Sequence, residues 1–205
     1  MKRDYWEQKY RGADLKWDIG TVSMPLKAYI DQLPDKNIKI LVPGAGRGHE
    51  VVYLHQNGFR NVFVADIAKA PLDHLGTVLP NFPKDRLLLG DFFLLKEQDF
   101  DLILEQTFFC AILPLKRKDY VAKMDGILKN GGKLVGLLFN FELTAEGPPF
   151  GGSILEYRSL FSLYFHLKVL EPAHNSIKPR KDRELFFIFE KRSDLGKSKS
   201  PFDTE

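Results

Sequence analysis

A glycine-rich turn between two apolar segments constrains the fold of this chain more than any other feature. Residues 39–66 read KILVPGAGRGHEVVYLHQNGFRNVFVAD. The apolar run at 40–42 stops at Pro43 and gives way to glycines at positions 44, 46 and 48, and a helical pattern follows over residues 50–56. A second apolar run, residues 62–65, ends on Asp66. The pattern predicts strand, turn, helix and strand, a unit that holds a nucleotide-like ligand over the carboxyl ends of parallel strands.

The spacing of the glycines separates two classes of nucleotide-binding protein. A dinucleotide-binding fingerprint is G-x-G-x-x-G, whereas His49 follows Gly48 here and the pattern is G-x-G-x-G. This form is typical of S-adenosylmethionine (SAM) methyltransferases, because their cofactor has no pyrophosphate. We therefore expect Gly44, Gly46 and Gly48 at the cofactor, and Asp66 as the acceptor for the ribose hydroxyls. A glycine turn without a ligand is the alternative, since such turns are common between a strand and a helix.

Length and composition bound the class of protein. The 205 residues suit one domain, residues 1–192, and a net charge of +3 gives no argument for nucleic acid as a partner. The single cysteine, Cys110, excludes an internal disulfide and indicates a reducing compartment. Neither a secretory signal nor a membrane-spanning stretch is apparent, and the histidines show no metal-ligand spacing. We expect a cytoplasmic monomer with no membrane partner and no metal.

The rest of the chain extends the strand–helix alternation to five repeats. We expect helices over residues 26–33, 68–79, 115–128 and 155–164, and further strands over residues 86–89, 100–105, 133–141, 166–171 and 184–191. The polar residues 173–183 leave no room for a crossover helix, so the last two strands should be antiparallel. The prediction is a three-layer α/β sandwich, a Rossmann-like SAM methyltransferase fold whose seven-stranded sheet is mostly parallel with an antiparallel last strand. A polar tail, residues 193–205, should be disordered.

The N-terminal segment, residues 1–24, carries three large aromatic residues among polar ones. Trp6 and Tyr10 share one face if this part is helical, and Trp17 follows. Two roles stay open, namely packing a short helix onto the body of the protein or forming a lid over the site. The sulfonium of SAM is a cation without hydrogen-bond donors, so aromatic faces are its natural neighbours.

Acidic residues stand at successive strand ends, and these ends meet over one crevice in a doubly wound sheet. Asp91 suits the adenine amino group, with Phe92 or Ile67 against the ring. The fourth strand ends on Glu105 and lacks the Asn/Asp-Pro-Pro-Tyr/Phe signature of amino-nitrogen methylation. Beyond the glycines, the cofactor contacts expected at this edge are Asp66, Ile67, Asp91, Phe92 and Glu105.

Taken together, the motifs resemble one family. WEQKYRGADLKWDIG, VPGAGRGHEV, VADI, GDFF, FDLILEQTFFCAILP and the GPPFGG loop are similar, in this order, to the thiopurine S-methyltransferase superfamily, and most of all to its plant-type thiol/halide methyltransferase branch. The resemblance implies a SAM-dependent methyltransferase that releases S-adenosylhomocysteine (SAH). It also implies cofactor contacts for Trp6, Tyr10 and Trp17, and a substrate-side loop over residues 147–150.

Two departures from the family pattern bear on the acceptor. Tyr10 stands where the plant-type branch has tryptophan, and Gln106 stands where the thiopurine enzymes have arginine and the plant-type enzymes tyrosine. The resemblance places position 106 at the cofactor–substrate junction, so the acceptor cannot be carried over. The substrate-side candidates are Glu105, Gln106, Pro149 and Phe150, with no residue assigned to catalysis.

The expected activity is methyl transfer from SAM to a small soft nucleophile, such as a thiol, a thiopurine-like compound, thiocyanate or a halide. Three alternatives stay open: a SAM-binding protein without turnover, an O- or N-methyltransferase of a small metabolite, and an NAD(P)-dependent enzyme, against which His49 argues. Other polar residues receive structural interpretations. Cys110 is expected as a buried core thiol, His49 as a capping or packing residue, and residues 178–183 (KPRKDR) as a solvated turn, with the binding of an anionic substrate as its alternative.

Overall fold

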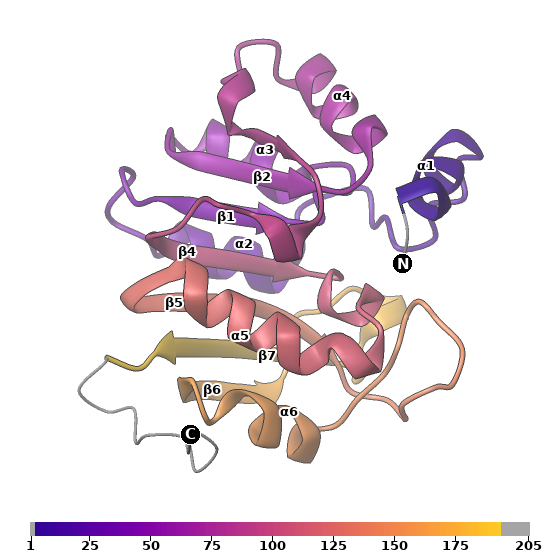
Figure 1. Ribbon diagram of the computed structural model, residues 1–205, viewed down its shortest axis with the longest axis vertical. Coiled ribbons are helices and arrows are strands. Elements are labelled where there is room, and N and C mark those ends of the chain that lie inside the picture. The colour runs from indigo at the N-terminus through magenta and orange to yellow at the C-terminus, as the bar shows by residue number, and fades with distance from the viewer. Residues whose placement is uncertain (1–2, 194–205) are drawn as a thin grey trace, which may run out of the picture.

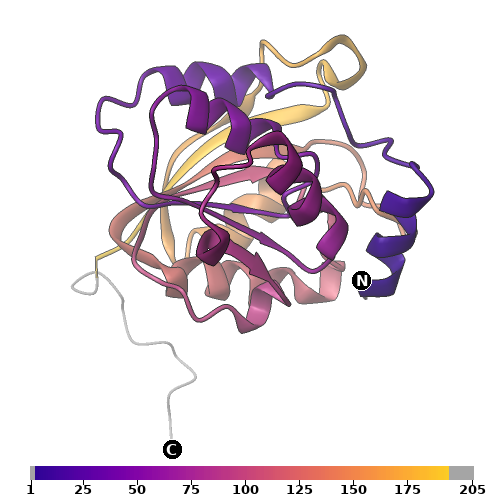
Figure 2. The same cartoon turned by 90° about the horizontal axis from the view of Figure 1, so that it is seen from above.

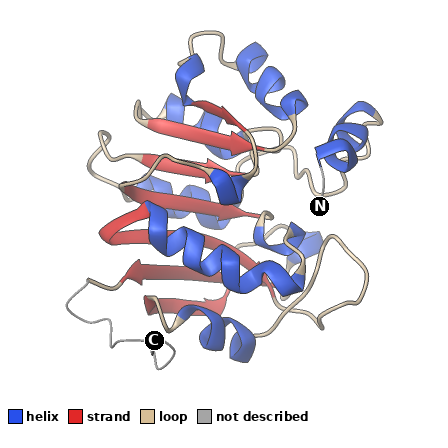
Figure 3. Ribbon diagram, in the orientation of Figure 1, coloured by secondary structure: helices blue, strands red, loops and turns tan. Residues whose placement is uncertain are grey.

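The computed structural model describes residues 3–193 and shows a seven-stranded sheet between layers of helices (Figures 1 and 3). The strand order is β3-β2-β1-β4-β5-β7-β6. The helices are α1 (Arg3–Arg11), α2 (Met24–Asp31), α3 (His49–Gln56), α4 (Lys69–Val78), α5 (Arg117–Ile127) and α6 (Ile154–Phe161). The strands are β1 (Ile40–Pro43), β2 (Val62–Asp66), β3 (Leu87–Leu89), β4 (Phe100–Gln106), β5 (Leu128–Phe139), β6 (Phe165–Pro172) and β7 (Glu184–Lys191). The expected tail lies outside the described residues from position 194 onward.

The direction of the strands confirms the predicted sheet. Strands β1 to β5 pair in parallel, whereas β7 runs antiparallel to both of its neighbours, β5 and β6. All four residues of β1 are buried, as befits a strand covered on both faces. The chain leaves β1 toward β2 on one side and returns to β4 on the other, so the order reverses at β1 and opens a crevice at the strand ends.

The two faces of the sheet have different cores. On one face, α2, α3 and α4 pack aliphatic side chains such as Leu26, Leu54 and Leu75 against the strands. The opposite face is aromatic, and the ring centroids of Phe161 and Phe189 lie 4.9 Å apart there. Figures 1 and 2 show α5 on one side of the sheet and α2 on the other. The sheet is thus buried on both faces, which leaves its edges and strand ends for function.

Between β3 and β4 the chain forms a single 3₁₀ turn, Phe92–Leu94, because residues 90–99 are fewer than a crossover helix needs. One expectation about the elements was wrong. Strand β5 begins at Leu128, directly after α5, so the glycine pair that looked like a helix stop lies inside the strand. A Cβ on Gly132 would lie 2.8 Å from the carbonyl oxygen of Phe100, which explains why glycine stands there. The other boundaries agree within a few residues.

None of the described helices is both long enough and apolar enough to cross a bilayer.

Candidate active site

A cavity of about 620 Å³ lies at the carboxyl ends of the parallel strands. It has the size of a site for a nucleoside-sized ligand together with a small second molecule. Figure 1 shows α1 standing beyond the arrowheads of these strands. Of the residues expected at the cofactor, the following line the cavity: Trp6, Tyr10, Trp17, Gly44, Gly46, Gly48, Asp66, Ile67, Asp91 and Phe92.

The glycine loop has a backbone that other residues rarely adopt. Gly44, Gly46 and Gly48 have φ angles of +66°, +54° and +73°. A Cβ on Gly44 would lie 2.6 Å from the ring of Phe108. Gly44 is therefore required by its own φ and by a neighbour at the end of β4, and the loop presents bare backbone to the cavity.

Asp66, at the end of β2, is a buried carboxylate held by backbone. Its Oδ1 accepts a hydrogen bond of 2.8 Å from the N–H of Ala68, and its side chain is 9 % exposed. Burial raises the pKa of Asp66 to about 6. Hydrogen bonds from the N–H groups of Ala68, Ala45 and Gly46 favour the charged form and oppose part of this rise. The arrangement fixes the carboxylate at the cavity wall, where it can accept from a pair of hydroxyls.

The wall next to Asp66 is flat and partly apolar. Phe92 is buried and packs edge-on against Phe108, with ring centroids 5.1 Å apart. The exposed Asp91 caps the 3₁₀ turn, and its Oδ1 accepts a hydrogen bond of 2.9 Å from the N–H of Phe93. Ile67 lines the same part of the cavity. Phe92 and Ile67 thus give the cavity apolar surface for a planar ring, and Asp91 gives it a carboxylate that can accept from an amino group.

The three N-terminal aromatic residues form one cluster on the cavity. Trp17 makes edge-to-face contacts with Trp6 and Tyr10, with centroid distances of 5.5 and 5.7 Å. Burial is the main cause that raises the pKa of Tyr10 above its usual range, which keeps the phenol neutral. Helix α1 docks on α4, where Glu7 Oε1 accepts from the N–H of Lys69 at 2.6 Å. This arrangement supports the lid interpretation, because all three rings face the cavity.

The substrate-side candidates divide into two groups. Gln106 and Pro149 line the cavity. Phe150 is buried outside the lining, and its N–H donates to the carbonyl of Cys110 at 2.8 Å. Phe150 thus ties the 147–152 loop to the turn after β4.

Glu105 is fully buried behind the cavity wall and does not line the cavity. Its Oε1 accepts from the N–H groups of Phe108 and Phe109 at 2.8 and 2.9 Å, and its Oε2 accepts from the hydroxyl of Tyr120. Burial raises the pKa of Glu105 to about 7. The geometry gives Glu105 a positioning role for the turn that carries Phe108, in place of the ligand contact expected from its position at a strand end.

Two polar residues of the cavity, Arg180 and His49, were interpreted from the sequence mainly as structural, with the binding of an anionic substrate as the alternative for the stretch of Arg180. Arg180, in the stretch taken as a solvated turn, is 11 % exposed in its side chain and lines the cavity. His49 also lines the cavity, with Nε2 2.7 Å from Asp18 Oδ1. The one available signal for Arg180 was Glu184, a carboxylate at the start of an apolar strand that needs a partner. The place of His49 depends on its contact with Asp18, 31 residues away in sequence, which no local pattern shows.

Cys110 lines the cavity while being 8 % exposed. Its Sγ donates to the carbonyl of Thr107 at 3.2 Å, and burial is the main cause that raises its thiol pKa. The thiol is therefore neutral and is a weak nucleophile. Among residues 3–193, no three histidine, cysteine or acidic side chains gather as a metal site.

Known proteins with similar sequences are methyltransferases. Residues 1–197 match the family described as thiopurine S-methyltransferase. A protein of Arabidopsis thaliana named "Probable thiol methyltransferase 2" is 31 % identical, over 92 % of this chain and 85 % of that protein. "Thiocyanate methyltransferase 1" of Brassica oleracea is 29 % identical (87 % and 81 %), and "Thiopurine S-methyltransferase" of Vibrio parahaemolyticus is 25 % identical (79 % and 82 %).

Solved structures with the same fold share less sequence. The 1,6-didemethyltoxoflavin-N1-methyltransferase of Burkholderia thailandensis, crystallised with SAH, has a TM-score of 0.72 at 18 % identity, over 93 % of this chain and 86 % of that one. The magnesium protoporphyrin IX methyltransferase of Synechocystis, crystallised with SAM, has a TM-score of 0.68 at 12 % identity, over 93 % and 95 %. These likenesses confirm the predicted fold.

Proposed function

This chain belongs to the thiopurine S-methyltransferase family and is a SAM-dependent methyltransferase, and from that premise we propose that its cavity brings SAM together with a small soft nucleophile. The acceptor is a thiol, a thiopurine-like compound, thiocyanate or a halide ion. One observation carries the proposal: a single cavity joins the glycine loop and Asp66 to the lining that Gln106 and Pro149 provide.

The residues of the cofactor half fit SAM. The bare backbone at Gly44 admits close approach of a nucleoside, and Asp66 is placed to accept from the ribose hydroxyls. Phe92 and Ile67 would cover the adenine, while Trp17 and its two ring partners, Trp6 and Tyr10, would face the sulfonium. When bound, SAM supplies an electrophilic methyl group. The chain's own contribution is to orient the two reactants and to exclude water.

The acceptor half favours a nucleophile that arrives already ionised. To this half we assign five residues of the cavity lining: Gln106, Cys110, Phe139, Pro149 and Arg180. No carboxylate or histidine belongs to this group of described residues, and Cys110 is neutral because burial raises its pKa. A neutral alcohol or amine needs a base to lose its proton, whereas thiolates, thiocyanate and halides need none. This composition supports transfer to soft anions over O- or N-methylation.

Methyl-labelled SAM tests the proposal directly. Purified protein is incubated with hydrosulfide, thiocyanate, iodide, an aryl thiol and a thiopurine, with a phenol and an amine for comparison. We expect label in a volatile or extractable product from at least one soft nucleophile and none from the phenol or amine. Binding of SAM by calorimetry without transfer to any acceptor would instead favour a binding protein without turnover.

We also propose that residues 1–192 act as one domain and as a cytoplasmic monomer without nucleic acid or membrane partners. A single cysteine and a modest net charge of +3 support this. Sedimentation of the purified protein, alone and with nucleic acid, tests it. A dimer at micromolar concentration would overturn it.

A further inference from the structure

We define the aromatic lid as residues 3–19, which carry Trp6, Tyr10 and Trp17. Its helix, α1, has no buried residue. Packing of apolar side chains is therefore not enough to explain how the lid stays on the cavity. Its docking on α4 uses two hydrogen bonds, from the N–H of Lys69 to Glu7 and from Arg3 to the carbonyl of Ile67. Both hold the start of the lid. The end of the lid, where Trp17 meets the cavity, needs its own anchors.

The first anchor is Arg180, which reaches the lid from the segment before β7. Its Nη2 donates to the carbonyl oxygen of Trp17 at 2.6 Å. Its Nη1 lies 3.1 Å from Oε1 of Glu184, a buried carboxylate that also accepts from Ser176. The guanidinium also lies over the ring of Phe139, 5.7 Å from its centroid. Arg180 is thus fixed by the body of the protein and offers its second arm to the lid.

The second anchor is the next residue of the lid, Asp18. Its Oδ1 accepts from the N–H of Gly20 at 2.8 Å and lies 2.7 Å from Nε2 of His49. Its Oδ2 lies 3.8 Å from Nε of Arg47. Burial alone would raise the pKa of Asp18, but Gly20, His49 and Arg47 together hold it below its ordinary value. Asp18 is therefore a carboxylate that ties the lid to the glycine loop.

We propose that Asp18 and Arg180 are positioning residues that hold the aromatic lid closed over the reacting groups. Successive lid residues are tied to two different segments of the body, Trp17 to Arg180 before β7 and Asp18 to His49 after the glycine loop. Loss of either anchor lets the lid open in the free enzyme, and cofactor binding must then close it. The role in turnover rests on the proposed function, whereas the anchoring itself does not.

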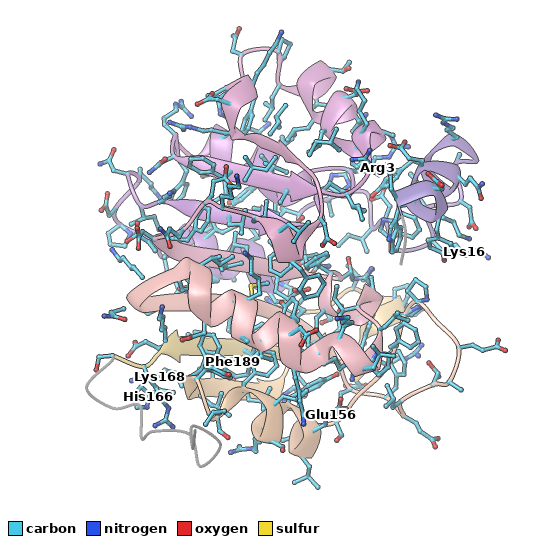
Figure 4. The ribbon with its side chains drawn as sticks, in the orientation of Figure 1. Arg3, Lys16, Glu156, His166, Lys168 and Phe189 are labelled. Atoms are coloured by element: carbon cyan, nitrogen blue, oxygen red, sulfur yellow. The ribbon has the colours of Figure 1, made fainter. Side chains whose placement is uncertain are left out.

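Tryptophan fluorescence reports on the lid alone, because the chain has two tryptophans and both lie in the lid. Acrylamide quenching of the ligand-free protein is compared for wild type, Asp18→Asn and Arg180→Lys. Glu190→Gln is the matched control, since it removes an ion pair with Lys168 at 3.3 Å. Figure 4 shows Lys168 on the far side of the molecule from Lys16 of the lid.

We expect Asp18→Asn to increase quenching and to weaken SAH binding about fivefold to tenfold, the scale of one lost ordinary hydrogen bond. KM for SAM should rise while kcat at saturating SAM stays within about twofold, because bound cofactor closes the lid again. Arg180→Lys keeps the charge and should fall between wild type and Arg180→Ala in both quenching and KM. Glu190→Gln should match wild type.

Quenching and SAH affinity unchanged from wild type in folded Asp18→Asn would overturn the anchor at Asp18. Suppose that Arg180→Lys matches wild type in quenching and KM, and that Arg180→Ala only lowers the melting temperature. Arg180 would then contribute to stability and would not anchor the lid. Failure of the wild type to bind SAH would count against the proposed function instead, and quenching of the free protein would still decide the anchors.

Discussion

Asp66 is buried and lines the cavity. Burial raises its pKa to about 6, so the carboxylate loses its charge at a mildly acidic pH. A protonated carboxyl still accepts one hydrogen bond well but loses the symmetric acceptor that a ribose diol prefers. The ionised form should therefore bind the cofactor more tightly.

The first prediction follows from this titration. SAH affinity should be constant above pH 7 and should fall as the pH drops through about 6. Asp66→Asn should weaken binding by about 2–3 kcal/mol, because a bond to a charged acceptor is lost, and should remove this pH dependence. Calorimetric titrations from pH 5 to 8 measure both. Equal affinity at both ends of the range in the wild type would contradict the role of Asp66.

Glu105 gives a second prediction, about stability. The ordinary pKa is 4.5 and the folded pKa about 7. Below pH 4.5 the Glu105 carboxyl is protonated in both the folded and the unfolded state. Between pH 4.5 and 7 it ionises only in the unfolded chain, so the free energy of unfolding falls as the pH rises. Above pH 7 both states are ionised, and the free energy of unfolding levels off. Glu105→Gln should flatten this part of the curve, as urea unfolding between pH 4.5 and 8 would show.

Asp66 has a raised pKa too and contributes a slope of the same sign, so the comparison between wild type and Glu105→Gln isolates the part due to Glu105. Asp66→Asn is the matched control and should keep that part. Identical slopes for wild type and Glu105→Gln would show that the buried carboxyl ionises as freely as in the unfolded chain.

At the scale of the elements, one buried arginine connects α5, α6 and the 147–152 loop. Arg117 is 1 % exposed; its Nη1 contacts Glu156 Oε1 at 2.6 Å and its Nη2 donates to the carbonyl of Gly151 at 2.7 Å. Glu156 lies on α6, which covers the lower part of the sheet in Figure 4. Arg117 therefore fixes the 147–152 loop to α5 and α6.

Arg117→Met should lower the free energy of unfolding by about 2–4 kcal/mol, because the buried carbonyl of Gly151 and the carboxylate of Glu156 lose their partner. KM for the acceptor should rise, whereas SAH affinity should change little, since Arg117 is not among the described residues that line the cavity. Lys168→Met, which removes an exposed ion pair, is the control and should cost less than about 1 kcal/mol. A weakened SAH affinity with a normal KM for the acceptor would instead place the 147–152 loop on the cofactor side of the cavity.

The elements themselves could be predicted well where local signals end them. Strand β7 was expected at its observed bounds because an apolar run stands between polar turns. The start of β5 was missed because two glycines look like a helix stop, whereas their reason is the approach of the neighbouring strand at Phe100. The anchors of the lid were missed because Arg180 and Trp17 are 163 residues apart in sequence. Contacts of that kind follow from the fold and not from any local pattern.

At the scale of the whole molecule, the cavity joins a cofactor half rich in titratable groups to an acceptor half that lacks a base. The rate with a thiol acceptor should therefore follow the ionisation of the thiol. We expect kcat/KM to rise about tenfold per pH unit below the acceptor's own pKa, and to shift along the pH axis with a more acidic thiol. Rates for two alkyl thiols of different pKa between about pH 7 and 9 measure this, because alkyl thiols ionise in or above this range. A common profile for both would indicate a titrating group of the protein.

The contact between Gly44 and Phe108 joins the ends of β1 and β4, the two strands between which the sheet reverses its order. Each residue limits the other: a larger side chain at 44 collides with the ring, and the ring occupies the space that a side chain at 44 would take. These two positions should consequently change together during evolution. Relatives that keep an aromatic residue at the position of Phe108 should keep glycine at that of Gly44. Because position 44 also has a positive φ, a replacement there should be asparagine or aspartate, and it should appear only in lineages where 108 has first become small.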